Sequence, residues 1–164
     1  YIYDSNTNTY TVYNADGLMN VAELVNGGKT DINITLDKNI DLTGKGWTPI
    51  GTDYDNSYTG TFDGGGHTIT GLTVTTNDEY AGLFGYLGNF GNFGNAAGTV
   101  KNVVMDGIQI TCNHRLGYAG GVAGFSWGTI ENCSVSGSIS GTVSVGGVVG
   151  AQTVSYTHLR AHET

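Results

Sequence analysis

A glycine-rich cassette that occurs three times constrains the fold of this chain more than any other feature of the sequence. It reads "YAGLFG" from Tyr80, "YAGGVAG" from Tyr118 and "VGGVVG" from Val145. Glycine weakens the interior of a strand, so its repeated use beside valine and leucine needs a structural reason. Glycine allows corners with positive φ and lets two backbones approach closely. The cassettes therefore predict corners or close contacts at equivalent points of successive repeats.

Three further segments repeat at nearly constant spacing: "HTITGLTV", "GTVKNVVM" and "GTIENCSV". They align Thr68, Thr99 and Thr129 at spacings of 31 and 30 residues. Three columns of the alignment are apolar in every repeat: Ile69, Val100 and Ile130; Leu72, Val103 and Cys133; Val74, Met105 and Val135. A single coil cannot bury its own apolar face, so these columns predict stacked coils with one shared core. Asparagines also align, which predicts a ladder of stacked turns formed by Asn102 and Asn132, with Gly71 in that place in the first repeat.

The local patterns indicate short strands and one helix. Segments such as "TVKNV", "IQIT" and "SVSGSIS" alternate with period two and are rich in β-branched residues, as strands are. The segment "YNADGLMNVAELVNGG" instead has helical spacing, in the apolar residues Leu18, Val21, Ala22 and Val25. Asn14 or Asp16 can cap its start and Gly27 can stop it. We expect this helix to cover the open N-terminal end of the repeat array.

Composition excludes several classes of partner. The chain has 164 residues, of which 12% are charged, and its formal net charge is −8 with six lysines and arginines in total. Without a basic cluster it is not expected to bind nucleic acid or an anionic membrane. No apolar run approaches the roughly 20 residues of a membrane span, so no membrane insertion is expected in this segment. Cys112 and Cys133 could pair, but Cys133 falls in an apolar column, which favours buried free thiols.

The last eleven residues, Val154 to Thr164, differ from everything before them. They read "VSYTHLRAHET", which is the translation of a common transposase-based sequencing adapter, and we expect this tail to be a non-native artefact. The expected organisation is therefore an N-terminal cap at 1–60, repeat coils at 61–153 that are truncated, and the artefactual tail at 154–164. Further repeats or domains of the parent chain are expected to follow the coils.

The repeated motifs resemble a known family. In order, "LMNVAELVN", "ITLDKNIDLTG", "WTPIG", "GTFDGGGHTITGL", "AGLFG", "GTVKNV", "GGVAG", "GTIENCSVSG" and "GGVVG" are similar to the GLUG-motif repeat proteins of bacterial surfaces. The resemblance extends from Asn14 to Gly150. It implies an all-β fold, a right-handed parallel β-helix (a solenoid) with one short N-terminal capping helix. It also implies secretion to the extracellular space or cell surface as part of an adhesin-like protein, and it offers no catalytic residues.

The sequence provides little for metal or catalytic chemistry. The zinc motifs "HExxH" and "CxxC" are absent, so no cofactor is expected. A weak calcium candidate remains in "DYDN", where Asp53, Asp55 and Asn56 have the spacing of the first EF-hand ligands but lack the later ones. A glycosidase would need two carboxylates that flank one bond, which Asp37, Asp41 and Asp63 could supply, but Asp41 in "NIDLTG" is more plausible as a turn cap. We therefore expect no enzymatic activity.

Aromatic residues in predicted turns are the better candidates for binding. Phe90 and Phe93 lie in the glycine- and asparagine-rich loop "GNFGNFGN", close to Tyr86, and Trp127 lies in another turn, as do Tyr54 and Tyr58. Flat aromatic faces beside amide groups suit stacking against a sugar or a protein. The alternative is that Phe90 and Phe93 fold back over the flank as a hydrophobic clasp. The candidate ligand-binding residues are Tyr86, Phe90, Phe93 and Trp127.

Together these observations predict a non-catalytic repeat module of an exported bacterial cell-surface protein, with a role in adhesion or ligand presentation. Its expected partner is a host glycan or a host surface protein. One alternative is a structural spacer within a large secreted peptidase, which would bind no ligand. The other is a fragment of a β-helix polysaccharide lyase or glycosidase, which would place carboxylates together in one groove.

Overall fold

The computed structural model describes residues 1–89, 98–152 and 157–163, and most of their regular structure is β. One helix, α1 (Ala15–Asn26), lies near the N-terminus. The strands are β1 (Ile2–Asp4), β2 (Thr9–Val12), β3 (Asn33–Leu36), β4 (Ile40–Asp41), β5 (Thr61–Asp63), β6 (Thr68–Thr70), β7 (Thr73–Thr76), β8 (Tyr80–Ala81), β9 (Phe84–Leu87), β10 (Thr99–Lys101), β11 (Val104–Cys112), β12 (Tyr118–Gly120), β13 (Ala123–Ser126), β14 (Thr129–Ser140), β15 (Ser144–Gly146), β16 (Val149–Gln152) and β17 (Thr157–Glu163). The expectation of a mostly β chain with one N-terminal helix is confirmed.

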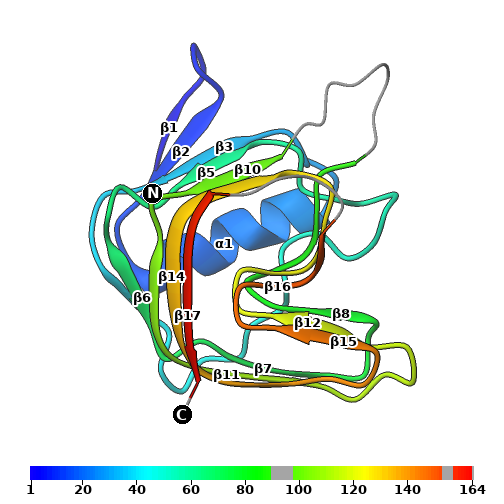
Figure 1. Ribbon diagram of the computed structural model, residues 1–164. Helices are drawn as coiled ribbons and strands as arrows, with labels where there is room; N and C mark the ends of the chain where they lie inside the picture. Colours follow the sequence, from blue (N-terminus) through cyan, green and yellow to red (C-terminus); the bar gives the residue numbers. More distant parts are fainter. Residues whose placement is uncertain (90–97, 153–156, 164) are drawn as a thin grey trace.

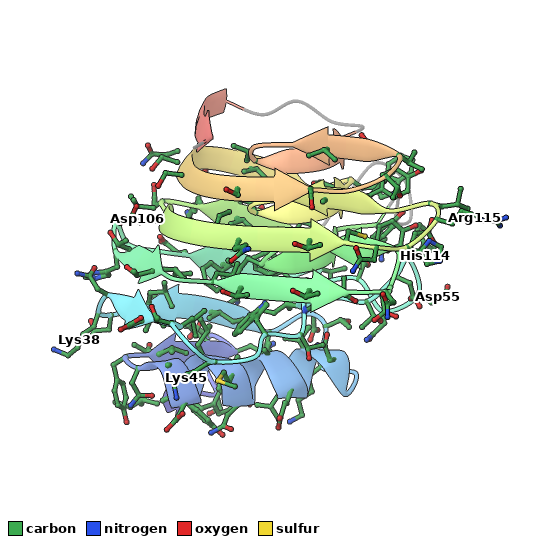
Figure 2. The ribbon with its side chains drawn as sticks, turned by 90° about the horizontal axis from the view of Figure 1, so that it is seen from below. Lys38, Lys45, Asp55, Asp106, His114 and Arg115 are labelled. Atoms are coloured by element: carbon green, nitrogen blue, oxygen red, sulfur yellow. The ribbon has the colours of Figure 1, made fainter. Side chains whose placement is uncertain are left out.

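The strands form three sheets in which successive passes of the chain lie side by side (Figure 1). The largest sheet has eleven strands in the order β1-β2-β3-β5-β10-β14-β11-β6-β4, with β17 on β14 and β7 on β11. The two smaller sheets have the orders β15-β12-β8 and β16-β13-β9. The β1–β2 pair is antiparallel, and the other pairs named here are parallel. Seen from the side, the passes form layers with α1 at one end of the stack (Figure 2).

Parallel registry builds the core as columns of apolar side chains. One column crosses five strands and contains Tyr10, Ile34, Phe62, Val100 and Ile130. All five side chains are buried. Removing one such side chain from water stabilises the fold by about 1.5 to 3 kcal/mol, but a single layer could not shield it. Each layer therefore depends on the layers above and below it.

The repeat alignment is correct for the second and third repeats and wrong for the first. Thr99 lies opposite Thr129, as expected, but its partner on the other side is Thr61 rather than Thr68. Ile69 consequently lies beside Met105 instead of Val100. The reason is that "GTFD" with β5, and not "HTIT" with β6, is the counterpart of "GTVK" with β10, while β6 pairs with β11. The corner between the two strands is also longer in the first repeat, at residues 64–67 against 102–103.

An asparagine ladder crosses this corner. Asn102 and Asn132 both have positive φ, at 59° and 51°. The Asn132 side-chain amide donates to Asn102 Oδ1 at 2.8 Å, and the Asn102 amide donates to Asp63 Oδ1 at 3.1 Å. The predicted ladder is therefore confirmed, but its first position is Asp63 and not Gly71. Gly71 lies elsewhere, with its N–H bonded to the Asp106 carbonyl.

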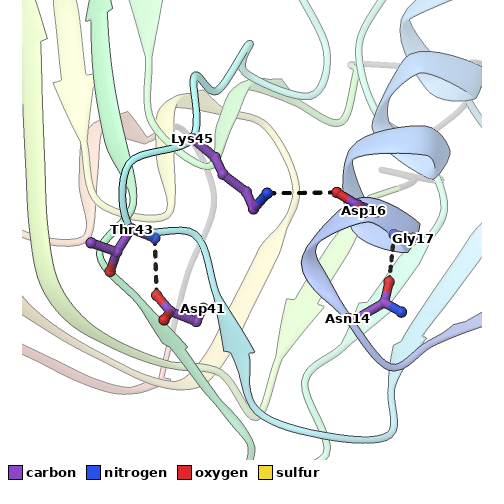
Figure 3. Close-up of polar contacts among 6 residues, drawn as sticks. All are labelled: Asn14, Asp16, Gly17, Asp41, Thr43 and Lys45. Carbon is purple, nitrogen blue, oxygen red and sulfur yellow. Dashed lines mark hydrogen bonds and ion pairs between the residues drawn. The ribbon is translucent and has the colours of Figure 1, made fainter.

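Helix α1 begins and ends where the sequence predicts. Asn14 is the N-cap, and its side-chain oxygen accepts a hydrogen bond from the Gly17 N–H at 2.8 Å (Figure 3). Gly27 is the C-cap. The apolar face of the helix is buried against the first strands, and it consists of Gly17, Leu18, Val21, Ala22 and Val25. Lys45 forms an ion pair with Asp16 at 3.6 Å, so a loop of the stack is tied to the first turn of the helix.

Cassette glycines allow close backbone contact. A Cβ added at Gly120 would collide with the carbonyl oxygen of Ala123 and lie 2.7 Å from the backbone nitrogen of Gly150 in the next layer. Its register partner Gly146 is equally crowded, by the carbonyl of Val149. Any side chain here would force the two small sheets apart. The prediction of close contacts at equivalent points is confirmed.

Two further expectations concern the cysteines and the tail. Cys112 and Cys133 are free and buried, as the sequence predicted. Burial raises the pKa of the Cys133 thiol to about 11.

Residues Thr157–Glu163 of the tail form β17, which pairs with the edge of β14. The non-native origin of 154–164 stays a prediction.

We expect Asn102→Ala to lower the free energy of unfolding by about 2 kcal/mol, because it removes two side-chain hydrogen bonds and places alanine at positive φ. Asn102→Gly keeps the backbone conformation and should lose about half as much. Urea denaturation measures both. Asn113→Ala, at an exposed asparagine outside the ladder, is the control. Equal stabilities of Asn102→Ala and the control would contradict a structural role for the ladder.

Gly120→Ala should destabilise the fold by about 2 kcal/mol or more, because its methyl group would enter space held by backbone atoms. Gly46→Ala is a matched control, since nothing lies within 4 Å of a Cβ at that position. Thermal unfolding followed by circular dichroism compares the two. A melting temperature unchanged in Gly120→Ala would contradict the proposed close approach of the sheets.

Candidate functional site

Six aromatic side chains gather where the two small sheets meet. They come from β8, β9, β12 and β13 and from adjoining loops, and we call them the aromatic cluster: Tyr54, Tyr80, Tyr86, Tyr118, Phe125 and Trp127. Strand side chains alternate between faces, and in these strands the inward positions are filled by small or apolar residues such as Ala81 and Ala119. The rings therefore lie on the outer side of the core.

Parallel registry stacks the rings in pairs along the layers. Tyr80 lies opposite Tyr118, with ring centroids 5.5 Å apart and planes inclined by 22°. Tyr86 lies opposite Phe125 in the other sheet, with centroids 5.0 Å apart and planes inclined by 17°. Stacked pairs of this kind arise because equivalent residues of adjacent parallel strands share a face.

Edge-to-face contacts join the two sheets within each layer. Tyr80 and Tyr86 have centroids 5.0 Å apart at an interplanar angle of 88°. Tyr118 and Phe125 repeat the contact one layer on, at 5.8 Å and 86°. Each such contact is worth about 0.5 to 1.5 kcal/mol beyond burial of area. The cluster is therefore a rigid two-layer block of four rings with two further rings beside it.

Tyr54 and Trp127 complete the cluster. Tyr54 packs edge-on against Tyr86 with centroids 6.0 Å apart, and Trp127 lies 5.9 Å from Phe125. The Trp127 indole N–H donates to the Tyr86 hydroxyl at 2.6 Å. Tyr86 is 5% exposed, Tyr54 is 49% exposed and the other rings are half-buried. The cluster thus presents partly exposed rings around an enclosed central tyrosine.

The cluster contains two of the predicted binding residues. Tyr86 and Trp127, which lie 41 positions apart, are brought into direct contact. Phe90 and Phe93 lie outside the described residues. Tyr58, which the sequence placed among the turn aromatics suited to binding, is fully buried in the core. Its hydroxyl donates a hydrogen bond to the Ile32 carbonyl at 2.8 Å, so its ring is not available to a ligand.

Sequence reasoning missed Tyr80, Tyr118 and Phe125. The signal was present, because Tyr80 and Tyr118 are the first residues of two cassettes and Tyr86 and Phe125 follow the closing glycines. The third cassette has no aromatic residue in either column. Ser144 lies opposite Tyr118 and Ala151 lies opposite Phe125. The cluster is therefore two layers deep and ends at small side chains.

Burial and a nearby carboxylate keep the hydroxyls protonated. The pKa of Tyr80 is raised to about 12, mainly because its hydroxyl is partly buried. The negative charge of the nearby Glu79 raises this pKa further. Burial also raises the pKa of Tyr86. At neutral pH both phenols are therefore hydrogen-bond donors beside flat apolar faces. This arrangement suits non-covalent binding, and it supplies no nucleophile.

Two of the carboxylates considered for calcium or for glycoside hydrolysis, Asp53 and Asp41, accept hydrogen bonds from the backbone of turns. Asp53 accepts a hydrogen bond from the Asn56 N–H at 2.9 Å, and Asp55 is exposed on the flank of the molecule (Figure 2). Asp41 accepts a hydrogen bond from the Thr43 N–H (Figure 3). Hydrogen bonding to the side chain and the backbone of Thr43 lowers the pKa of Asp41. Within the described part of the chain, no three histidine, cysteine, aspartate or glutamate side chains are grouped as metal ligands.

Comparison with protein families gives a direct match to the strands that carry half of the cluster. Residues 116–140 match the family model of the GLUG motif. The GLUG motif here spans β12, β13 and β14, and so includes Tyr118, Phe125 and Trp127. The resemblance predicted from the sequence is thus confirmed for this segment.

Two similar proteins are much longer than this chain. Halomucin of Haloquadratum walsbyi is 34% identical over 163 residues, which cover 93% of this chain and 2% of that protein. A proposed Gly-rich membrane protein of Evansella cellulosilytica is 33% identical over 135 residues, which cover 78% of this chain and 14% of that protein. Among the described residues of this chain, no helix has the length and apolar character needed to cross a membrane.

A solved structure shares the fold. The crystal structure of a protein from Bacteroides ovatus proposed to be an immunoglobulin A1 protease matches with a TM-score of 0.53 and 21% identity. The match covers 95% of this chain and 66% of that chain. At this identity the likeness concerns the fold alone.

The raised pKa of Tyr80 predicts a loss of stability at high pH. In the unfolded chain the hydroxyl ionises near pH 10, and in the folded chain near pH 12. The unfolded state loses its proton first, so the contribution of Tyr80 is complete below about pH 10 and is lost between about pH 10 and 12. The melting temperature of Tyr80→Phe should therefore fall less over this range than that of the wild type. Tyr13→Phe, at an exposed tyrosine, is the control; a fall equal to the wild type in Tyr80→Phe would contradict the assignment.

Proposed function

We propose that this chain is part of an exported cell-surface protein and that its aromatic cluster binds a ligand, a glycan or a protein, for adhesion or ligand presentation. In this proposal the layered strands are a section of right-handed parallel β-helix, which serves as a rigid support. The observation that carries the binding function is the aromatic cluster. Rings that are only partly buried in a stable protein commonly serve recognition, because exposed apolar surface is otherwise costly.

The relatives support the location at the cell surface. The GLUG motif is shared with the surface proteins that the sequence resembles, and one relative is named as a membrane protein. The chain corresponds to a small part of each curated relative, so it would act as one module among others. The low content of charged residues and the net charge of −8 agree with partners other than nucleic acid.

A structural spacer within a larger secreted protein is the second candidate. The likeness to the Bacteroides ovatus structure suits this role, since a stack of strands holds its two ends at a fixed separation. A spacer needs no ligand, and it would use the rings only to stiffen the junction between the sheets. The two functions therefore differ in whether loss of the rings changes binding or stability alone.

The third cassette supplies the substitutions that test ligand binding. Tyr118→Ser and Phe125→Ala introduce the residues that the next layer has in the same columns, Ser144 and Ala151, so the sheets already accommodate them. We expect the double variant to lose at least about tenfold in affinity for ligands found with the wild-type protein on a glycan array or a panel of host surface proteins. Biolayer interferometry with each ligand measures the change.

Tyr13→Ser is the matched control, because Tyr13 is exposed and outside the cluster. Circular dichroism should show that both proteins keep their strand content. Retention of binding by the double variant would exclude the cluster as the ligand site. Absence of binding by the wild-type protein would favour the spacer.

A further inference from the structure

A groove crosses three layers of the largest sheet, on a different side of the molecule from the aromatic cluster. It has a volume of about 250 Å³ and is lined by residues of β6, β11 and β14: Thr68, Val104, Met105, Asp106, Ser134, Val135 and Ser136. Figure 2 shows Asp106 on the opposite side of the stack from Asp55, which is next to Tyr54 in the chain. Pockets for drug-sized ligands measure about 300 to 1,000 Å³, so this groove suits a single small ring.

A β-bulge in β11 positions the carboxylate of the groove. The register of β11 on β14 shifts just after Met105. Asp106 and Gly107 therefore lie together opposite the single residue Ser136. Gly107 has a φ of 63°, and nothing lies within 4 Å of a Cβ added there, so the bulge is open to solvent. The Ser136 hydroxyl donates a hydrogen bond to Asp106 Oδ1 at 2.8 Å, which fixes the carboxylate beside β14.

Hydroxyl groups line the rest of the groove. Thr68 and Ser134 lie on either side of Val104 in one register column. Both are half-buried, and neither hydroxyl has a partner among the described residues. Val104 is 38% exposed between them. The carboxylate of Asp106 has about four acceptor positions, of which Ser136 uses one. A ligand in the groove therefore meets hydroxyls, a carboxylate and one apolar surface.

This set of groups excludes several classes of ligand. Calcium takes about six to eight oxygen ligands, and one carboxylate with three hydroxyls does not supply them. Of the seven described residues that line the groove, Asp106 alone is charged, and together with the net charge of −8 it repels anions. A stable protein interface uses about 20 to 30 residues on each side, far more than the groove offers. A neutral ring with several hydroxyl groups matches it, because hydroxyls donate strong hydrogen bonds to a carboxylate.

We propose that this groove is a second binding site and that it takes one ring of a neutral sugar. In the complex Asp106 accepts hydrogen bonds from hydroxyl groups of the ring, and Thr68 and Ser134 exchange hydrogen bonds with others. The C–H groups of the ring pack on Val104. The site goes beyond the proposed function, because it uses no residue of the aromatic cluster and lies on another side of the stack.

The experiment titrates the full chain with the methyl glycosides of glucose, galactose and mannose. Each is compared with the corresponding methyl uronide, which carries a carboxylate in place of one CH₂OH group. NMR shifts of the backbone amides report both affinity and location. We expect at least one neutral glycoside to shift the amides of Thr68, Asp106 and Ser136, and its uronide to bind at least about tenfold more weakly. Absence of these shifts with all three glycosides, or equal binding of the uronides, would overturn the inference.

Two variants test the roles of the lining residues. Asp106→Asn keeps the size of the side chain and removes its charge, so affinity for the glycoside should fall about tenfold. Ser134→Ala should weaken binding about fivefold. It removes no side-chain hydrogen bond within the described chain, so it tests the site independently of the bulge. Asp55→Asn, the same chemical change at an exposed carboxylate on the other side, is the matched control and should have no effect. Unchanged affinity in both groove variants would contradict the site.

The groove and the aromatic cluster can be separated in the same titration. The double variant Tyr118→Ser and Phe125→Ala should bind the glycoside as the wild type does, because it leaves the groove intact. Loss of glycoside binding in this variant would overturn the groove as the site. Loss of array ligands in the double variant, with glycoside binding retained, would support two independent sites.

Discussion

Parallel pairing in register links most strand residues of the described chain to the residue about one repeat away, and the rest of the structure depends on that link. Strands of adjacent passes lie about 4.8 Å apart, so equivalent side chains touch whether or not they attract each other. Apolar columns such as Tyr10, Ile34, Phe62, Val100 and Ile130 turn this contact into a continuous core. The same contact would make a polar or oversized residue costly in every layer it enters.

The aromatic cluster follows from the same register on the outer face. Tyr80 stacks on Tyr118 and Tyr86 on Phe125 because their strands are paired, and the meeting of two sheets adds the edge-to-face contacts. A binding surface made this way is rigid, since each ring is fixed by its own strand and by a neighbouring ring. Its depth is set by the sequence, and it ends where Ser144 and Ala151 enter the columns.

Much of the fold could be predicted from the sequence, because its strongest signals are local. The cap at Asn14, the stop at Gly27 and the asparagine turns each depend on residues close together in the chain. The register of the first repeat could not, because "TFD" and "TIT" have the same alternation of polar and apolar residues, and either could align with "TVK". The cluster was only partly predicted, since the candidates were aromatic residues in predicted turns, such as Tyr86 and Trp127, and Tyr80 and Tyr118 begin strands. Which face of a short strand points outward depends on how the two small sheets pack against each other, and the pattern within one strand does not reveal this.

Stacking also explains why charges are few and where they occur. Like charges in adjacent layers would repel at the spacing of paired strands, and the column Asp63, Lys101 and Glu131 alternates in sign. The asparagine ladder likewise begins with one carboxylate and continues with neutral amides. Neutral amides can pair from layer to layer without the repulsion that a column of carboxylates would add at this spacing.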